Sequence, residues 1–203
     1  MDFIPLMVDL SQKQVVVIGG GKIAARRVSV LTQYTKRITV VSPTVTEGLE
    51  HLAKQQSIQW HNKIFENSDV EKADLIVAAT NDVATNQAIL NAKPSKALIN
   101  MVGKANAGDI LFPSILRRGK LTISISTQGA SPMLTTHILE ALQQYFNSAY
   151  GDYVDFLYDC RQRIKHSSLI STEKETFLKK MLNEKYLNIN KQQEVRKWLD
   201  TLD

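Results

Sequence analysis

A glycine-rich turn has the clearest chemical meaning in this sequence. Gly19, Gly21 and Ala24 follow the spacing G-x-G-x-x-A, after an apolar β-branched run and before a segment of helical periodicity. In this setting Gly19 permits a tight turn, Gly21 lets the backbone approach a pyrophosphate, and Ala24 allows a helix to pack closely on a strand. The free N–H groups that open the helix hold phosphates. We therefore predict a dinucleotide site that includes Lys22 and Ile23; the alternative is a glycine turn without a ligand.

The ribose-binding part of such a site is less complete. An acidic residue normally ends the second strand, but here that strand ends in Ser42, Pro43 and Thr44, and no arginine stands there either. The hydroxyls of Ser42 and Thr44 can bind a ribose with or without a 2′-phosphate. These residues leave the choice between NAD and NADP open.

A second polar turn is expected at the same crevice. Thr80 and Asn81 follow a buried apolar run, and the carboxyl ends of strands are where open α/β sheets bind ligands. Asp82 either shares this crevice or caps the next helix. We include Thr80 and Asn81 in the predicted cofactor site.

Alternating segments must position these turns. Strands are expected at residues 14–18, 38–41, 58–60, 75–79 and 97–101, and helices at residues 22–33, 49–54 and 83–92. Short buried strands that alternate with helices predict the α/β class, with a Rossmann-type doubly wound parallel sheet. We expect this sheet to end near Pro113.

The remainder has a different pattern. Residues 121–126 alternate apolar and polar side chains, as in an antiparallel or half-exposed strand. Ser131 then reads as an N-cap with Pro132 at the first helical position. The tail, residues 152–202, indicates about three helices with breaks near residues 167–168 and 188–190. We expect a helical C-terminal domain.

Composition sets the broad class. The 203 residues are 43% hydrophobic, enough to fill a core, and the formal net charge is +5. The basic residues are scattered without a nucleic-acid motif, so they indicate either a solvated surface or a polyanionic small substrate. One cysteine, Cys160, excludes an internal disulfide, and the first residues lack the features of a signal peptide. We expect a cytoplasmic chain that contacts neither nucleic acid nor membrane.

Further motifs make the chain resemble the precorrin-2 dehydrogenase family, whose module occurs alone or fused within siroheme synthases. The resemblance covers residues 1 to about 146, while the helical tail matches only in kind. It rests on residues 3–6, 17–21, 24–27, 40–43, 78–82, 112–114, 117–119 and 121–127, and most specifically on Gly129-Ala130-Ser131-Pro132.

The resemblance implies a Rossmann domain at residues 1–113, a dimerisation region at 114–147 and a helical domain at 148–203. It also implies a homodimer with the active site between these domains. The implied reaction transfers a hydride from precorrin-2 to NAD, with loss of a proton, and yields sirohydrochlorin. Basic residues are then either anchors for the anionic tetrapyrrole or simply solvated; the candidates are Lys22, Arg117, Arg118 and Lys120.

The proton acceptor is less well marked. Many relatives carry an aspartate three positions after Asn100, whereas this chain has Gly103. The nearest acid, Asp109, either accepts the proton or, as a loop aspartate, holds backbone amides. His137 is a candidate proton carrier or metal ligand, or else an exposed helix residue. Ser131 is first a helix cap and second a candidate substrate contact, and no metal site is predicted.

Three other functions fit parts of the sequence. A bifunctional enzyme would also insert iron or cobalt into sirohydrochlorin, but without the aspartate it lacks an obvious base for the pyrrole protons. A non-catalytic NAD-sensing regulatory protein would explain the first hundred residues but not the segment 129–132 or the tail. A generic alcohol dehydrogenase would need a proton-relay set, such as Tyr/Lys or His/Asp, which is not evident.

Overall fold

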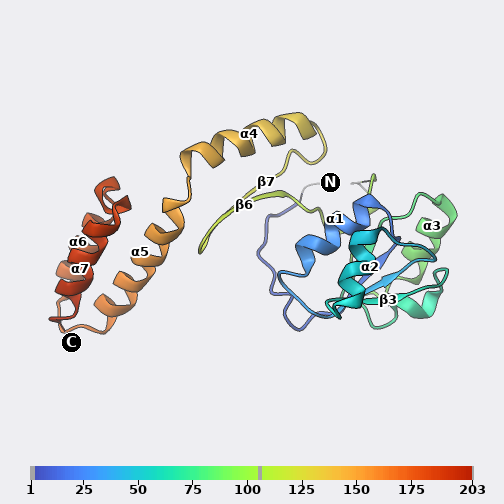
Figure 1. Ribbon diagram of the computed structural model, residues 1–203, viewed down its shortest axis with the longest axis horizontal. Coiled ribbons are helices and arrows are strands. Elements are labelled where there is room, and N and C mark those ends of the chain that lie inside the picture. The colour runs from blue at the N-terminus through green and yellow to red at the C-terminus, as the bar shows by residue number, and fades with distance from the viewer. Residues whose placement is uncertain (1–2, 105–106, 203) are drawn as a thin grey trace. The chain divides into compact units, whose positions relative to one another are not determined.

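The computed structural model describes residues 3–104 and 107–202 of the chain (Figure 1). The chain forms two compact units, Met1–Phe112 and Pro113–Asp203. Each unit has its own core. The further division of the second unit into a dimerisation region and a helical domain at residue 147 remains a proposal. Within the described residues, no helix is long and apolar enough to cross a membrane.

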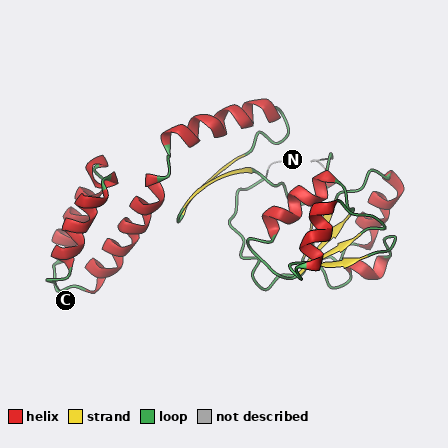
Figure 2. Cartoon of the chain, in the orientation of Figure 1, coloured by secondary structure: helices red, strands yellow, loops and turns green. Residues whose placement is uncertain are grey.

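A five-stranded parallel sheet forms the centre of the first unit (Figure 2). Its order is β3-β2-β1-β4-β5. The strands are β1 (Val15–Ile18), β2 (Ile38–Val41), β3 (Gln59–His61), β4 (Leu75–Ala78) and β5 (Leu98–Met101). β1, β2 and β4 are buried along their whole length, as their continuous β-branched and aliphatic runs predict. The predicted Rossmann-type sheet is confirmed, and each observed strand begins or ends within one residue of its expected range.

Helices cover both faces of this sheet. α1 (Lys22–Leu31) and α2 (Glu47–Lys54) pack on one face together with Val15 and Val17 of β1. α3 (Val83–Ala92) and the short helix η1 (Asn67–Val70) pack on the other face. Alternate residues of β1 point to the two faces, which explains why a strand of this kind needs an unbroken apolar run.

The order of the strands creates a switch point. From β1 the chain continues to β2 and β3 on one side, and then returns to β4 and β5 on the other side. The connections that leave β1 and β4 at their carboxyl ends therefore diverge. In open α/β sheets this divergence is where ligands bind.

The second unit begins with a β-hairpin, of which the sequence predicts one strand. β6 (Ser114–Arg118) pairs antiparallel with β7 (Leu121–Ile125), and only the second strand was predicted. The two strands meet at Gly119, which has a φ of +54°. α4 (Pro132–Tyr145) packs against both strands.

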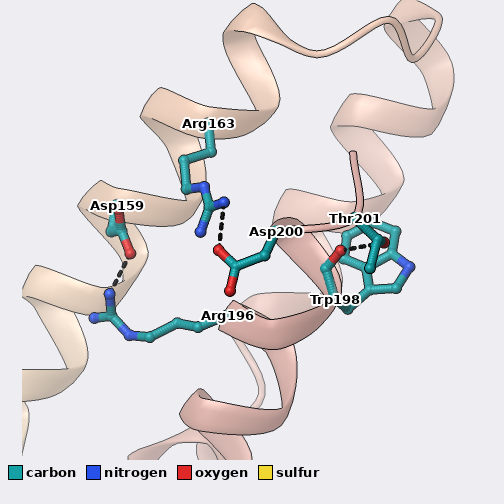
Figure 3. A network of polar contacts seen from close by, with 6 residues as sticks. All are labelled: Asp159, Arg163, Arg196, Trp198, Asp200 and Thr201. Atoms are coloured by element: carbon teal, nitrogen blue, oxygen red, sulfur yellow. Dashed lines mark hydrogen bonds and ion pairs between the residues drawn. The ribbon is translucent and has the colours of Figure 1, made fainter. Parts of the chain in front are cut away.

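The helical part of the second unit contains α5 (Ala149–His166), α6 (Ser171–Met181), η3 (Glu184–Leu187) and α7 (Ile189–Leu199). They surround a core that includes Phe156, Cys160 and Ile164 of α5. Two ion pairs join α5 to α7: Arg163 contacts Asp200 at 2.6 Å, and Asp159 contacts Arg196 (Figure 3). The predicted helical tail is confirmed. Its second break was predicted too late, because α7 already begins at Ile189 and the connection from α6, which contains η3, spans residues 182–188.

Candidate cofactor-binding site

A crevice of about 700 Å³ opens at the switch point of the first unit. Three turns border it, and each follows the carboxyl end of a strand. Its lining includes the predicted residues Gly19, Gly21, Lys22, Ile23, Ser42, Pro43, Thr44, Thr80 and Asn81. The sheet topology therefore brings together nine of the ten residues that the sequence assigned to a cofactor.

The glycine turn is packed against two neighbouring segments. A β-carbon on Gly19, which has a φ of +114°, would lie 2.4 Å from the carbonyl oxygen of Ala79. A β-carbon on Gly20 would lie 2.0 Å from the carbonyl oxygen of Thr44. By contrast, no atom lies within 4 Å of the corresponding position on Gly21, so the backbone at Gly21 faces open space. That space is what a pyrophosphate needs in order to approach the turn.

The N-terminus of α1 is chemically suited to a phosphate. Gly21 is the N-cap, no side chain bonds to the first N–H groups, and no acidic residue lies in the first turn. Elsewhere Asp82 caps α3 and Ser131 caps α4 through side-chain oxygens. An uncapped N-terminus leaves N–H donors and the positive end of the helix dipole available to an anion. Ala24 does not line the crevice; it is fully buried and packs α1 on the sheet.

The turn after β2 is built around Ser42. Its hydroxyl donates to the carbonyl oxygen of Thr44 at 2.7 Å, and its own carbonyl accepts from Trp60 Nε1 at 2.9 Å. Ser42 is only 7% exposed, whereas Pro43 and Thr44 are exposed at the rim. Ser42 therefore shapes the turn, and Thr44 is better placed to meet a ribose. None of the crevice-lining residues is acidic.

The turn after β4 is held by α3. Asp82 accepts a hydrogen bond from the backbone N–H of Thr85 at 2.8 Å, so its capping role is confirmed. Hydrogen bonds from the Thr85 side chain and backbone lower the pKa of the Asp82 carboxyl. Asn86 bonds to both the carbonyl and the hydroxyl of Thr80. Asn86 was not singled out in the sequence because helical periodicity gives no sign of such a contact.

Asp109 lies beside β5 and does not line the crevice. Its carboxylate accepts the backbone N–H of Ile99 at 3.1 Å and pairs with Lys93 at 3.1 Å. Asp109 thus holds a backbone amide, as the alternative predicted, but that amide belongs to β5 and not to its own loop. Its role as proton acceptor remains a prediction. The loop 104–108 that leads to it includes residues 105 and 106, which lie outside the described residues.

The other proposed catalytic residues belong to the second unit. The Ser131 hydroxyl accepts from the backbone N–H of Leu134 at 3.1 Å, as expected for a cap. His137 is exposed on α4. Of the candidate anchors, Arg118 donates to the carbonyl oxygen of Phe146, and Lys120 lies 3.6 Å from Asp155. These two cations therefore have structural partners within their own unit.

Comparisons with known proteins agree with this geometry. The family model described as "Putative NAD(P)-binding" matches residues 6–114, and the model described as "SirC C-terminal domain" matches residues 150–195. The precorrin-2 dehydrogenase of Priestia megaterium is 35% identical over 93% of this chain and 94% of its own length. The siroheme synthase of Zymomonas mobilis is 32% identical over 90% of this chain but 39% of its own length. A solved structure of SirC, precorrin-2 dehydrogenase, aligns with a TM-score of 0.86 and 32% identity over 98% of this chain and 100% of the other.

Proposed function

This chain belongs to the precorrin-2 dehydrogenase family, and on that premise we propose that it oxidises precorrin-2 to sirohydrochlorin, a step of siroheme biosynthesis, with NAD as the hydride acceptor. The observation that carries the proposal is the crevice at the switch point, where an uncapped helix and an open glycine meet. Neither a metal-inserting activity nor a sensing role is favoured by the relatives.

The residues around the crevice fit a dinucleotide. Gly21 leaves room for the pyrophosphate, and the free N–H groups of α1 can bind its oxygens. Lys22, at the first position of α1, is the charged residue among those that line the crevice and adds a cation beside the phosphates. The turns at Thr44 and Thr80 offer hydroxyls on two sides of the site.

The reaction needs little covalent chemistry from the protein. When bound, NAD accepts one hydride, and precorrin-2 also releases one proton as sirohydrochlorin forms. The task of the chain is to hold the macrocycle against the cofactor and to receive that proton. For the proton acceptor we propose His137 and Asp109 as the residues to test, with Ser131 as a substrate contact.

We also propose a homodimer and a cytoplasmic location. The resemblance to the family supports the dimer. A reducing compartment suits a chain in which the single cysteine is buried and free. Sedimentation of the purified chain at several concentrations would test the dimer: a species of twice the chain mass is expected, and a monomer at every concentration would overturn it.

The proposed reaction can be tested by anaerobic absorbance spectroscopy with precorrin-2 as substrate. The assay is run without cofactor, with NAD and with NADP, and then with cobalt or iron added after oxidation is complete. We expect the sirohydrochlorin spectrum to form only with a nicotinamide cofactor, and metal addition to give no enzyme-dependent change. Failure of a folded, NAD-binding preparation to convert precorrin-2 would contradict the proposal. Catalysed metal insertion would revive the bifunctional alternative.

A further inference from the structure

The turn after β4 is tied to α3 by a two-point contact. The half-buried side chain of Asn86 lies against Thr80, one of the residues that line the cofactor crevice. Asn86 Nδ2 donates to the carbonyl oxygen of Thr80 at 3.1 Å, and Asn86 Oδ1 lies 3.0 Å from the Thr80 hydroxyl. The nitrogen and the oxygen of the Asn86 amide therefore both contact Thr80, a single residue of the site.

The chemistry of these atoms fixes the direction of each hydrogen bond. A backbone carbonyl only accepts, so the NH₂ group of Asn86 must face the Thr80 carbonyl. The amide oxygen of Asn86 then faces the Thr80 hydroxyl, and the hydroxyl must donate to it. The second neighbour of this hydroxyl, the carbonyl oxygen of Asp82 at 3.1 Å, is also an acceptor. The single hydroxyl proton of Thr80 is thus committed to the protein.

We propose that Asn86 is a positioning residue of the cofactor site, which orients the Thr80 hydroxyl so that it presents acceptor lone pairs to the bound dinucleotide. The complementary group on the ligand is a donor, either a ribose hydroxyl or the amino group of the carboxamide. This inference rests on the proposed use of NAD. It assigns a role to a residue that does not itself line the crevice.

The position of Thr80 gives this orientation its effect. The preceding residue, Ala79, carries the carbonyl oxygen that abuts Gly19 of the phosphate-binding turn. Asn86 therefore fixes a turn that is packed directly on the glycine motif. Without Asn86 the Thr80 hydroxyl keeps the Asp82 carbonyl as its partner, but the turn loses both bonds that hold Thr80 to α3. The acceptor lone pairs of the hydroxyl are then less well aimed at a ligand donor, which weakens that bond.

Calorimetric titration of the full chain with NAD tests the inference without precorrin-2. Removing one oriented hydrogen bond by Thr80→Val or by Asn86→Ala should raise the Kd for NAD about tenfold. Thr80→Ser, which keeps the hydroxyl, should change the Kd by less than about threefold. Because Asn86 acts on the cofactor through the Thr80 hydroxyl but also holds the Thr80 carbonyl, adding Asn86→Ala to Thr80→Val should cause clearly less than the additive loss. The matched control is Gln87→Ala, an exposed neighbour on α3 that bonds to Asn91 and should leave the Kd unchanged.

The outcomes separate positioning from a merely structural role. If Asn86 has only a structural role, Asn86→Ala lowers Tm but leaves the Kd for NAD, measured well below Tm, within about twofold of the parent value. That result would overturn the inference. Fully additive losses in the double variant would overturn it as well. If Asn86→Ala does not fold, the contrast between Thr80→Val and Thr80→Ser decides, and equal Kd values overturn it. In turnover, the KM for NAD should rise while the KM for precorrin-2 stays unchanged. A chain that binds NAD as described but does not oxidise precorrin-2 would refute the proposed function and leave this inference standing.

Discussion

The Cα of Gly19 lies so close to Ala79 that a β-carbon there would sit 2.4 Å from the Ala79 carbonyl oxygen. Gly19 directly follows β1 and Ala79 directly follows β4, the two strands from which the chain diverges in opposite directions across the sheet. Both residues line the crevice, so this contact fixes the glycine turn against the turn after β4. The three consecutive glycines of that turn have different neighbours, so they should respond differently to substitution.

Gly21→Ala should fold normally but bind NAD poorly. Its backbone has a φ of −78°, which alanine adopts without strain, and no protein atom is near its β-carbon position. The added methyl group instead occupies space that the pyrophosphate needs, so the Kd for NAD should rise at least about tenfold. Calorimetry with NAD and thermal unfolding without NAD measure the two effects separately. Gly48→Ala, at another open position, is the control and should leave NAD binding unaltered.

Gly20→Ala should behave in the opposite way. Its β-carbon would lie 2.0 Å from the backbone carbonyl of Thr44, so the turn after β2 must move before the chain can fold. Overpacking against backbone costs about 1–3 kcal/mol or more. Thermal unfolding of the free chain should show this loss. A Gly20→Ala variant as stable as the parent would contradict the tight packing of these two turns.

Gln56→Gly should stabilise the chain. Gln56 follows α2 with a φ of +58°, and the N–H groups of Gln56 and Ser57 bond back to Ala53 and Leu52 in a Schellman arrangement. Glycine removes about 1–2 kcal/mol of left-handed strain and adds unfolded-state entropy, for a net gain of about 0.5–1 kcal/mol. Urea unfolding measures the change in free energy. Gln55→Gly, where the φ is −79°, is the matched control and should destabilise the chain.

Cys160 should be unreactive until the second unit unfolds. Its side chain is fully buried, and burial raises the pKa of the thiol from 9.0 to about 11. Because the folded pKa lies above the unfolded value, the contribution of this thiol to stability is present below pH 9.0 and is lost as the pH rises from 9.0 toward 11. Alkylation at pH 8 should be slow in the native chain and fast in urea. Rapid labelling of the native chain would show that α5 is not packed as described.

The two ion pairs between α5 and α7 should differ in strength. Arg163 is 23% exposed but its partner Asp200 is 65% exposed, whereas Asp159 and Arg196 are 34% and 41% exposed, so neither end of the second pair is as open to water as Asp200. Exposed pairs contribute about 0.2–1 kcal/mol, so the coupling of Arg163 with Asp200 should lie at the lower end and that of Asp159 with Arg196 at the upper end. Double-mutant cycles in low and high salt measure both, and both couplings should shrink in high salt. Coupling energies that are equal for the two pairs and do not change with salt concentration would argue against this arrangement.

Local pattern predicts some parts of this molecule better than others. The roles of Gly19 and Gly21 follow from a motif read within six residues, and strands such as β1 and β4 follow from unbroken apolar runs. Gly20 occupies a variable position of the motif. A glycine is needed there only because folding brings the backbone of Thr44 beside it. Tertiary contacts of that kind leave no trace in periodicity.

The same reasoning explains the other differences. Ser42 lines the crevice as expected, but its hydroxyl proton is donated within its own turn, and only the fold reveals that partner. Asn86 looks like any polar helix residue until α3 is packed beside Thr80. The strand β6 has a mixed burial pattern and ends in two arginines, so neither an alternating nor a continuous apolar signal marks it.

The most direct test of the proposed reaction is its stoichiometry. NADH and sirohydrochlorin should be quantified together, without oxygen, as the purified chain acts on precorrin-2. If a hydride passes from the macrocycle to the cofactor, the two products form in a one-to-one ratio, and Gly21→Ala slows both equally at limiting NAD. Sirohydrochlorin formed without matching NADH, or no product from a chain that binds NAD, would contradict the account.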